Sequence, residues 1–331
     1  MLGSMPLWDS LADLTVRVDD YALERRELQV SDEFTRVTTT IVLRGDGETG
    51  AGEDVTYIAE EHDHVPSEVM LAGTWTLDDY SGALDDLEVG GGDYRRWAFE
   101  SAALDLALRQ TGRSLAEVVG RPYRPVRFVV STRSDIEPYL ALNDELEFKL
   151  DVEADWDREL MERLAATGRV RVLDLKAYYR NTQVDLAPDP VLYRAVVESF
   201  PDVVIEDAWL EGEAREALRG AEERLSFDAP IHSLDDLDDL AVEPRWLNVK
   251  PSRFGTLRGL LECIEACEER GITMYGGGQF ELGPGRRQIQ RLASLFYADA
   301  PNDVAPSVYN EGPPKPGMPA SPLPAPDGVG F

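Results

Sequence analysis

Residues 169–208 contain one complete strand–helix–strand repeat, written RVRVLDL at 169–175, PVLYRAVVESF at 190–200 and DVVIEDA at 202–208. The two outer segments are short, rich in Val, Leu and Ile, and each runs into an acidic residue. The middle segment has the apolar spacing of a helix. Two strands joined by a helix run parallel in one sheet. This unit therefore predicts an α/β fold whose downstream strand ends share one face.

The same rhythm continues in both directions from this unit. Further strand segments are RPVRFVVS at 124–131, LEFKLDV at 146–152, RLSFDAPI at 224–231, RWLNVKP at 245–251 and GITMYGG at 271–277. This repetition favours a closed parallel barrel. An open doubly wound sheet is the alternative, but it would place its site at one switch point, whereas charged residues end most of these strands in succession.

Residue composition and the spacing of apolar residues divide the chain into three parts. Residues 1–122 contain alternating segments with Gly-rich turns followed by a helical pattern, which predicts an N-terminal α+β domain. Residues 123–305 contain the barrel repeats. Residues 306–331 are rich in Pro and Gly, and we expect this tail either to pack on the N-terminal domain or to stay loose.

Composition excludes several classes of partner. The formal net charge of −30 over 331 residues repels nucleic acid and anionic membranes. No apolar run reaches the length of about 20 residues that spans a membrane, and the N-terminus lacks the pattern of a signal peptide. Cys263 and Cys267, four apart in a helical segment, are expected to be reduced packing thiols. We therefore expect a cytoplasmic protein, and such acidity is compatible with a high-salt cytoplasm.

Five charged residues stand at the ends of strand segments: Lys149, Asp174, Glu206, Asp228 and Lys250. In a parallel barrel they would converge on one face. One such residue alone is ordinarily a solvated loop residue, but their repetition in step with the strands favours a site. Three carboxylates suit a hard divalent cation such as Mg²⁺. Flanking lysines suit proton transfer at a carbon made acidic by a metal-bound carboxylate.

The order and spacing of these motifs resemble the enolase superfamily, in its muconate-cycloisomerase and mandelate-racemase branches. The motifs are LRGDGETGAGED (43–54), WAFESAALDLALRQTGRSLAEVVG (97–120), FKLDV (148–152), RVLDLK (171–176), VVIEDA (203–208), FDAPIHSLDDL (227–237), NVKPSRFGTL (248–257) and YGGGQFELGPGRRQIQRLASLF (275–296). The resemblance implies a modified (β/α)₇β TIM-type barrel with an N-terminal α+β capping domain. It also implies Mg²⁺ bound by Asp174, Glu206 and Asp228, removal of the proton alpha to the carboxylate of a small substrate, and assembly into homo-oligomers.

The resemblance gives further residues a role. Lys250 would be the base, the acid or a cationic stabiliser, and Glu281 with the nearby Gln279 would lie beside the substrate. Loops around residues 28–35 and 62–67 would select the substrate, which makes His62 and His64 candidates for contacts with it. Two alternatives stay open: Glu281 braces the helix that follows it, and the two histidines are exposed loop residues.

The chain departs from the family pattern at two neighbouring positions. Asp151 stands where a second catalytic lysine is usual, and Lys176 stands where asparagine is common. Residues two apart on a strand share a face, so Lys149 and Asp151 form one pair and Asp174 and Lys176 another. Either Lys176 replaces the missing base, or its ammonium pairs with Asp151 or Asp174 and competes with the metal.

These two alternatives predict different proteins. The first keeps a lyase or isomerase, in which an elimination, such as dehydration or the o-succinylbenzoate-synthase type, is favoured over racemisation because the usual second lysine is absent. The second gives a catalytically silent, metal-free binding protein in which Lys176 replaces the metal charge.

Overall fold

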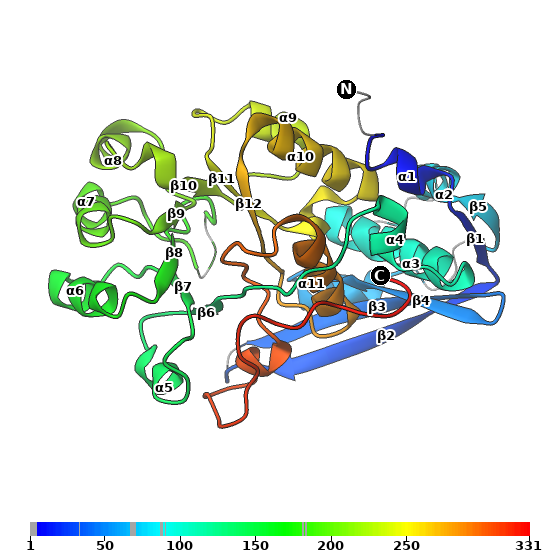
Figure 1. Ribbon diagram of the computed structural model, residues 1–331, viewed down its shortest axis with the longest axis horizontal. Coiled ribbons are helices and arrows are strands. Elements are labelled where there is room, and N and C mark those ends of the chain that lie inside the picture. Colours follow the sequence, from blue (N-terminus) through cyan, green and yellow to red (C-terminus); the bar gives the residue numbers. More distant parts are fainter. Residues whose placement is uncertain are drawn as a thin grey trace.

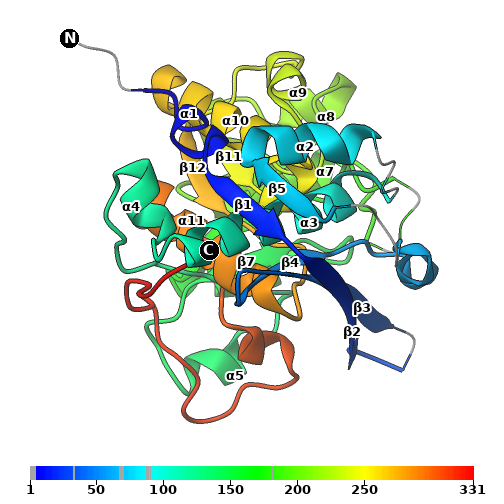
Figure 2. The same ribbon diagram turned by 90° about the vertical axis from the view of Figure 1, so that its right-hand side faces the viewer.

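The computed structural model describes residues 5–32, 34–66, 71–86, 89, 91–180, 182 and 184–331. It has an N-terminal capping domain of antiparallel strands and helices, followed by a parallel barrel (Figure 1). Viewed from the side, β2 and β3 of the cap form a long ribbon that extends beyond the neighbouring elements (Figure 2). None of the helices in the described ranges has the length and apolar character needed to cross a membrane.

The capping sheet is antiparallel, in the order β2 (Asp20–Gln29), β3 (Thr35–Gly45) and β4 (Glu48–Asp54). Thr, Val and Ile dominate β3, and these β-branched residues favour a strand. Asp46 and Gly47 join β3 to β4 with φ of 50° and 78°, as a two-residue hairpin turn requires. The other elements of the cap are α1 (Asp9–Ala12), β1 (Thr15–Val18), η1 (Ala59–His64), β5 (Gly73–Thr76), α2 (Leu77–Asp86), α3 (Gly92–Gln110) and α4 (Leu115–Val119).

Two glycines of β4 allow helix α3 to pack directly on the capping sheet. A Cβ atom at Gly52 would lie 2.0 Å from the carbonyl oxygen of Ala98, and one at Gly50 would lie 2.4 Å from that of Ala102. No side chain fits such a gap, so the glycines of the ETGAGED segment are required by close approach. The backbone of α3 therefore packs directly against β4.

The barrel is built from a seven-stranded parallel sheet in the order β12-β11-β10-β9-β8-β7-β6. Its strands are β6 (Val130–Thr132), β7 (Phe148–Asp151), β8 (Val170–Asp174), β9 (Val204–Glu206), β10 (Leu225–Phe227), β11 (Trp246–Val249) and β12 (Thr273–Gly276). Isolated parallel bridges join Asn302 to Phe128 and Asp303 to Gly277, so residues 302–303 connect the two edges of the sheet. The predicted (β/α)₇β barrel with an α+β cap is confirmed, and these bridges exclude an open sheet.

Helices between the strands begin at the capping residues that the sequence supplies. The side chains of Asp157, Asp189, Ser233 and Thr256 accept backbone N–H groups at the starts of α6, α7, α9 and α10. Cys263 and Cys267 are buried free thiols on α10. The helical elements of this part are α5 (Glu137–Leu140), α6 (Arg158–Ala166), α7 (Pro190–Ser199), α8 (Gly212–Ala217), η2 (Glu222–Arg224), α9 (Leu234–Asp238), η3 (Pro251–Phe254), α10 (Leu257–Arg270), α11 (Pro284–Phe296) and η4 (Ser307–Asn310).

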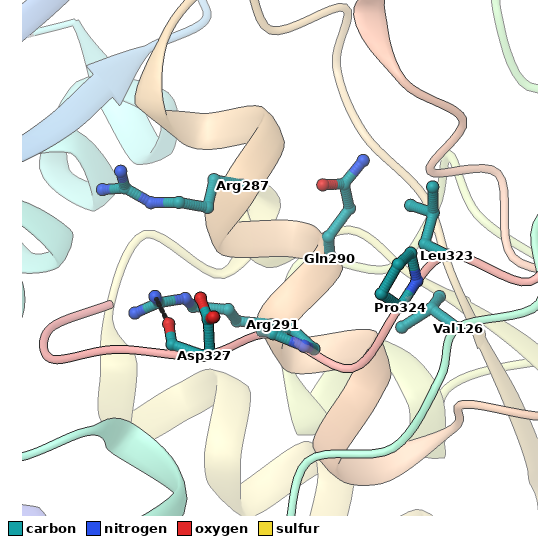
Figure 3. Close-up of a pocket in the computed structure, with 8 residues that line it drawn as sticks. Val126, Arg287, Gln290, Arg291, Leu323, Pro324 and Asp327 are labelled. Carbon is teal, nitrogen blue, oxygen red and sulfur yellow. Dashed lines mark hydrogen bonds between the residues drawn. The ribbon is translucent and has the colours of Figure 1, made fainter. Parts of the chain in front are cut away.

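The Pro- and Gly-rich tail runs along α11 towards the cap. Arg291 on α11 donates to the backbone carbonyl of Asp327 at 2.7 Å (Figure 3). It also donates to the carbonyl of Gly330 at 2.5 Å. Phe331 is fully buried, its N–H donates to Asp105 of α3, and its ring meets the ring of Trp97 edge-on. Specific polar contacts therefore hold this segment although it contains no helix or strand after η4.

Candidate active site

The five charged residues predicted at strand ends are all buried; four of them stand at the downstream strand ends, whereas Lys149 is the second residue of β7 and reaches the same carboxylates with its side chain. Asp174 ends β8, Glu206 ends β9, and the two are partners in the parallel ladder. Asp228 follows β10, and Lys250 follows β11. The three carboxylates have exposures of 0%, while Lys149 and Lys250 have 1% and 6%. Parallel strands thus bring charged groups together at a place where water cannot screen them.

Lys149 lies between the first two carboxylates. Its Nζ is 2.5 Å from Glu206 Oε1 and 3.2 Å from Asp174 Oδ2, with Asp303 Oδ2 at 3.7 Å. Burial lowers the pKa of Lys149, but these carboxylates outweigh it and hold that pKa well above its ordinary value. Lys149 is therefore a fixed cation at the centre of the site.

Glu206 is held by further side chains from β11 and β12. Asn248 Nδ2 lies 3.2 Å from both of its oxygens, and the Tyr275 hydroxyl donates to Oε2. Burial is the main effect that raises the pKa of Glu206, and Asp174 and Asp228 add to it while Lys149 opposes it. Asn248 is two residues before Lys250, so the period of a strand could have identified it from the sequence.

Lys176 pairs with two carboxylates from adjacent strands. Its Nζ is 2.6 Å from Asp174 Oδ2 and 3.2 Å from Asp151 Oδ1. Burial lowers the pKa of Lys176, but Asp174 and Asp151 outweigh it, so that pKa is raised. A lysine with a raised pKa keeps its proton at neutral pH, which favours a role as a cation over a role as a base.

Asp228 lies among cations on the opposite side of the site. Lys250 Nζ is 2.6 Å from its Oδ2, which also accepts from the Tyr179 hydroxyl at 3.0 Å. Arg253 Nε is 3.3 Å from Oδ1. Burial raises the pKa of Asp228, but Arg253 and Lys250 outweigh it and hold that pKa below its usual range. Asp228 is therefore ionised at neutral pH.

Asp207 is a site residue that the sequence did not indicate. Asp174, Glu206 and Asp207 each offer an oxygen, and these oxygens lie within 4.8 Å of one another; Asp228 is outside this group. Alternation along a strand would point Asp207 away from Glu206, but its φ of 53° breaks the alternation. Its two oxygens accept the N–H groups of Asp228 and Ala229 at 2.8 and 3.0 Å. Asp207 thus connects the ends of β9 and β10.

Residues predicted near the substrate are dispersed. Glu281 pairs with Arg286 at 3.2 Å and lines a separate pocket with Arg26 and Leu28. His62 is buried in the cap, where its Nδ1 meets Thr39 Oγ1 at 3.0 Å. In the described part of the chain, no hydrogen bond or ion pair joins these residues to the buried carboxylates.

His64 and Gln279, also predicted to contact the substrate, lie in different surroundings. His64 is exposed, and its carbonyl accepts from Arg95 at 3.4 Å. Gln279 lies against Arg253, and so it belongs to the surroundings of Asp228. Of the loops expected to select the substrate, Glu33 and Ser67 lie outside the described residues.

Two sequence models of one family together match most of the chain. The N-terminal domain of DUF8230, a domain of unknown function, matches residues 9–118, and its C-terminal domain matches residues 122–311. The chain belongs to the DUF8230 family. It is also 26% identical over 224 residues to o-succinylbenzoate synthase of Bacillus subtilis (strain 168), a match covering 63% of this chain and 58% of that protein.

Two solved structures show which fold this DUF8230 chain shares. Muconate lactonizing enzyme of Klebsiella pneumoniae has a TM-score of 0.70 and 17% identity, with 95% of each chain covered. An enolase-superfamily protein of Enterococcus faecalis has a TM-score of 0.65 and 22% identity, with 89% of this chain and 85% of that chain covered. The predicted resemblance to the enolase superfamily is confirmed, and at these identities the structures support the fold.

The carboxylates of this DUF8230 chain fit a hard divalent cation. Asp174 and Glu206 are adjacent, buried and supplied by rigid strand ends. Asp228 Oδ1 is buried, and among the described residues it accepts no hydrogen bond. Buried polar oxygens ordinarily accept hydrogen bonds, and within the described ranges Oδ1 has only the ion pair with Arg253 Nε at 3.3 Å, so it can still accept a ligand. Carboxylate oxygens are the ligands that hard divalent cations prefer, so the chemistry of these residues is appropriate; the oxygens that lie within 4.8 Å of one another are those of Asp174, Glu206 and Asp207.

Proposed function

We propose that this protein is a Mg²⁺-dependent lyase or isomerase that removes the proton alpha to the carboxylate of a small acid. The observation that supports it is the burial of Asp174, Glu206 and Asp228 at one end of an enolase-type barrel. These three residues would hold the ion, which when bound offsets the negative charge that develops on the substrate carboxylate. The o-succinylbenzoate synthase and muconate lactonizing enzymes to which the chain is similar support a small carboxylate substrate.

Lys250 is the residue proposed to move the proton. It stands at the exit of β11, while Lys149 stands on β7, so the two ammonium groups reach the carboxylates from different strands. Lys250 would take the alpha proton and return it, or pass it to a leaving group. Lys149 and Lys176, whose pKa values are raised by the carboxylates beside them, would act as fixed cations.

Elimination is the reaction type that these side chains favour. Racemisation needs a base on each face of the substrate carbon, and Asp151 stands where the second lysine of the family pattern would lie. Asp151 is paired with Lys176 at 3.2 Å. An elimination needs only one base, which removes the proton while the leaving group departs. We therefore place dehydration or an o-succinylbenzoate-synthase type of elimination ahead of racemisation.

Exchange of the alpha proton tests this proposal. A panel of acid sugars, dipeptides and N-acyl amino acids is incubated with the protein and Mg²⁺ in deuterated water, and proton NMR follows the alpha signal. We expect exchange with at least one class of acid. Lys250→Ala should stop this exchange and leave Mg²⁺ affinity nearly unchanged. Exchange at the wild-type rate in Lys250→Ala would remove this lysine from the mechanism.

A second candidate is a metal-free binding protein, and the position of Lys149 favours it. Its Nζ contacts both Glu206 and Asp174, and Lys176 contacts Asp174 as well, so ammonium groups already balance these charges. This protein would bind a small carboxylate without chemistry. Calorimetric titration with Mg²⁺ separates the candidates, because only the first predicts saturable binding that depends on Asp174, Glu206 and Asp228.

Location, assembly and domain limits complete the proposal. We place the protein in the cytoplasm as a homo-oligomer, with divisions between residues 122 and 123 and between 305 and 306. Light scattering coupled to size exclusion measures the assembly, and a monomer would contradict that part.

A further inference from the structure

Arg36 joins the capping domain to the barrel through backbone groups. Its side chain is fully buried, and its guanidinium donates to the carbonyls of Val55 and Thr56 in the cap and of Gln279 and Phe280 after β12. The distance to the Gln279 carbonyl is 2.8 Å. Within the described ranges no carboxylate forms an ion pair with Arg36. Several donors in a rigid fork fix the segment that they bind.

Glu53 fixes the same segment with the opposite charge. It is buried on β4 opposite Thr40 of β3, and its oxygens accept the N–H groups of Leu282, Gly283 and Gly285 at 2.7 to 3.0 Å. These N–H groups lie at the start of α11, where a negative charge is stabilised. The cap therefore clamps residues 279–285 from both ends, so the position of Gln279 depends on how the cap is docked.

The amide of Gln279 faces Arg253 on the barrel. With its oxygen turned to the guanidinium, Gln279 accepts from Arg253 Nε at 2.8 Å and from Nη2 at 3.1 Å. Arg253 also donates to the Ala229 carbonyl at 2.9 Å and to the Tyr179 hydroxyl at 3.1 Å. The remaining acceptor near Nε is Asp228 Oδ1, at 3.3 Å. Arg253 Nε thus stands between two acceptors, and Gln279 is the nearer one.

The carboxylate oxygen on the other side of Arg253 has this ion pair at 3.3 Å but, among the described residues, no hydrogen bond. Asp228 Oδ2 is bound by Lys250 and Tyr179, whereas Oδ1 accepts no hydrogen bond from the described residues. Without the Gln279 oxygen, the buried guanidinium would lose an acceptor and would move towards Oδ1, since a buried donor seeks a partner. A tight ion pair there would occupy the oxygen that a cation needs.

We propose that Gln279 is a positioning residue: it keeps Arg253 Nε at the 3.3 Å ion-pair distance from Asp228 Oδ1 and prevents a closer hydrogen bond, and the cap, through Arg36, holds Gln279 in place. This inference rests on the proposed cation site. It makes the docking of the cap a determinant of cation affinity in the barrel. It also gives Gln279 a role other than contact with the substrate.

Substitution of Gln279 tests the inference with Mn²⁺ alone as the probe. Met has nearly the shape of Gln and no acceptor, so Gln279→Met should weaken Mn²⁺ binding about tenfold, the lower end of the usual effect of residues that orient metal ligands. The spectrum of bound Mn²⁺ in electron paramagnetic resonance should also change, because Arg253 would compete with the ion for Asp228 Oδ1. Affinity is measured by titration of the free Mn²⁺ signal with the full chain.

Gln288→Met is the matched control. Gln288 is also a buried glutamine at the junction with the cap, and it donates to the Ala51 carbonyl at 2.8 Å. It makes no contact with Arg253 among the hydrogen bonds of the described residues. If Gln288 has only a structural role, Gln288→Met should change thermal stability and leave Mn²⁺ affinity within about twofold of the wild type. Equal losses of Mn²⁺ affinity in Gln288→Met and Gln279→Met would overturn the positioning role.

A second variant tests the link to the cap. Arg36→Lys keeps the charge but loses the fork that holds residues 279 and 280, and we expect it to weaken Mn²⁺ binding as well. Combined with Gln279→Met it should add little, because both changes act along one path. If Arg36→Lys does not fold, the Mn²⁺ affinity of Gln279→Met still tests the positioning role of Gln279. If Gln279→Met binds Mn²⁺ as tightly as the wild type, this inference is overturned and the proposed cation site is not. If the wild type itself does not bind Mn²⁺, the inference and the proposed cation site are both overturned.

Discussion

Glu206 is bound by side chains from three strands, with Lys149 on β7, Asn248 on β11 and Tyr275 on β12 all donating to it. Glu206→Gln keeps the shape of the side chain and removes its charge. We expect this change to abolish the increase in melting temperature that Mg²⁺ gives the wild type, because a ligand that binds only the native state stabilises it by mass action. Scanning calorimetry with and without saturating Mg²⁺ measures the effect.

Glu147→Gln is the control for this prediction. Glu147 pairs with Arg127 and Arg171, both at 2.6 Å, just upstream of β7 and so at the other end of the barrel. Its loss should lower stability equally with and without Mg²⁺. Protection by Mg²⁺ that persists in Glu206→Gln would count against the ligand assignment.

The residues of the candidate site differ in how far the sequence predicts them. Asp174, Glu206 and Lys149 lie on strands, where a period of two fixes the face of each side chain. Asp207 reverses that period with a left-handed φ of 53°, so no pattern indicates it. Tyr179 lies in an irregular segment after β8, where contacts rather than periodicity set its direction.

At the scale of elements, the contact between α3 and β4 depends on glycine. Gly52→Ala would place a methyl group 2.0 Å from the Ala98 carbonyl oxygen and 2.4 Å from Ser101 Oγ. The helix would have to move, and overpacking of this kind costs about 1–3 kcal/mol or more. We expect chemical denaturation of Gly52→Ala to show a loss of at least about 2 kcal/mol.

Gly82→Ala provides the opposite result as a control. Gly82 lies inside helix α2, is exposed, and an added Cβ would have no neighbour within 4 Å. Alanine stabilises a helix interior over glycine by roughly 0.5–1 kcal/mol, so this variant should gain stability. A Gly52→Ala variant as stable as the wild type would mean that α3 does not pack on β4 as described.

The order of the barrel elements and the closed barrel follow from the alternation of strand and helix patterns, but the residues that close the barrel do not. The segment RPVRFVVS predicted a strand over 124–131, whereas β6 covers only Val130–Thr132. The reason is that Val126 pairs with Leu323 and Phe128 pairs with Asn302, both distant in the sequence. Such short bridges have no periodic signal, so only the three-dimensional structure reveals which residues join the sheet edges.

At the scale of the whole molecule, net charge opposes the folded state. The chain carries 63 acidic and 33 basic residues, a net charge of −30. Most of the buried carboxylates among the described residues are paired with Lys or Arg, as Asp228 is with Lys250 and Asp54 with Arg95 at 2.9 Å, whereas Glu53 and Asp207 accept backbone N–H groups. Repulsion therefore arises chiefly among exposed Asp and Glu side chains, which salt screens readily because they face water.

We expect the melting temperature to rise by several degrees as KCl increases from low concentration to about 1 M, where the Debye length falls to roughly 3 Å. For a chain of 331 residues, a gain of about 1 kcal/mol raises the melting temperature by roughly 1–2 °C, so a rise of several degrees corresponds to a gain of several kcal/mol. The buried pairs should weaken little over this range, since they lie outside the reach of mobile ions. Scanning calorimetry in KCl measures the rise. Comparison with sucrose, which stabilises proteins without screening charge, separates charge screening from general exclusion of a solute from the protein surface. If screening is the cause, most of the gain in melting temperature comes at low ionic strength. A melting temperature that stays level or falls with KCl would show that repulsion among the surface charges does not limit stability.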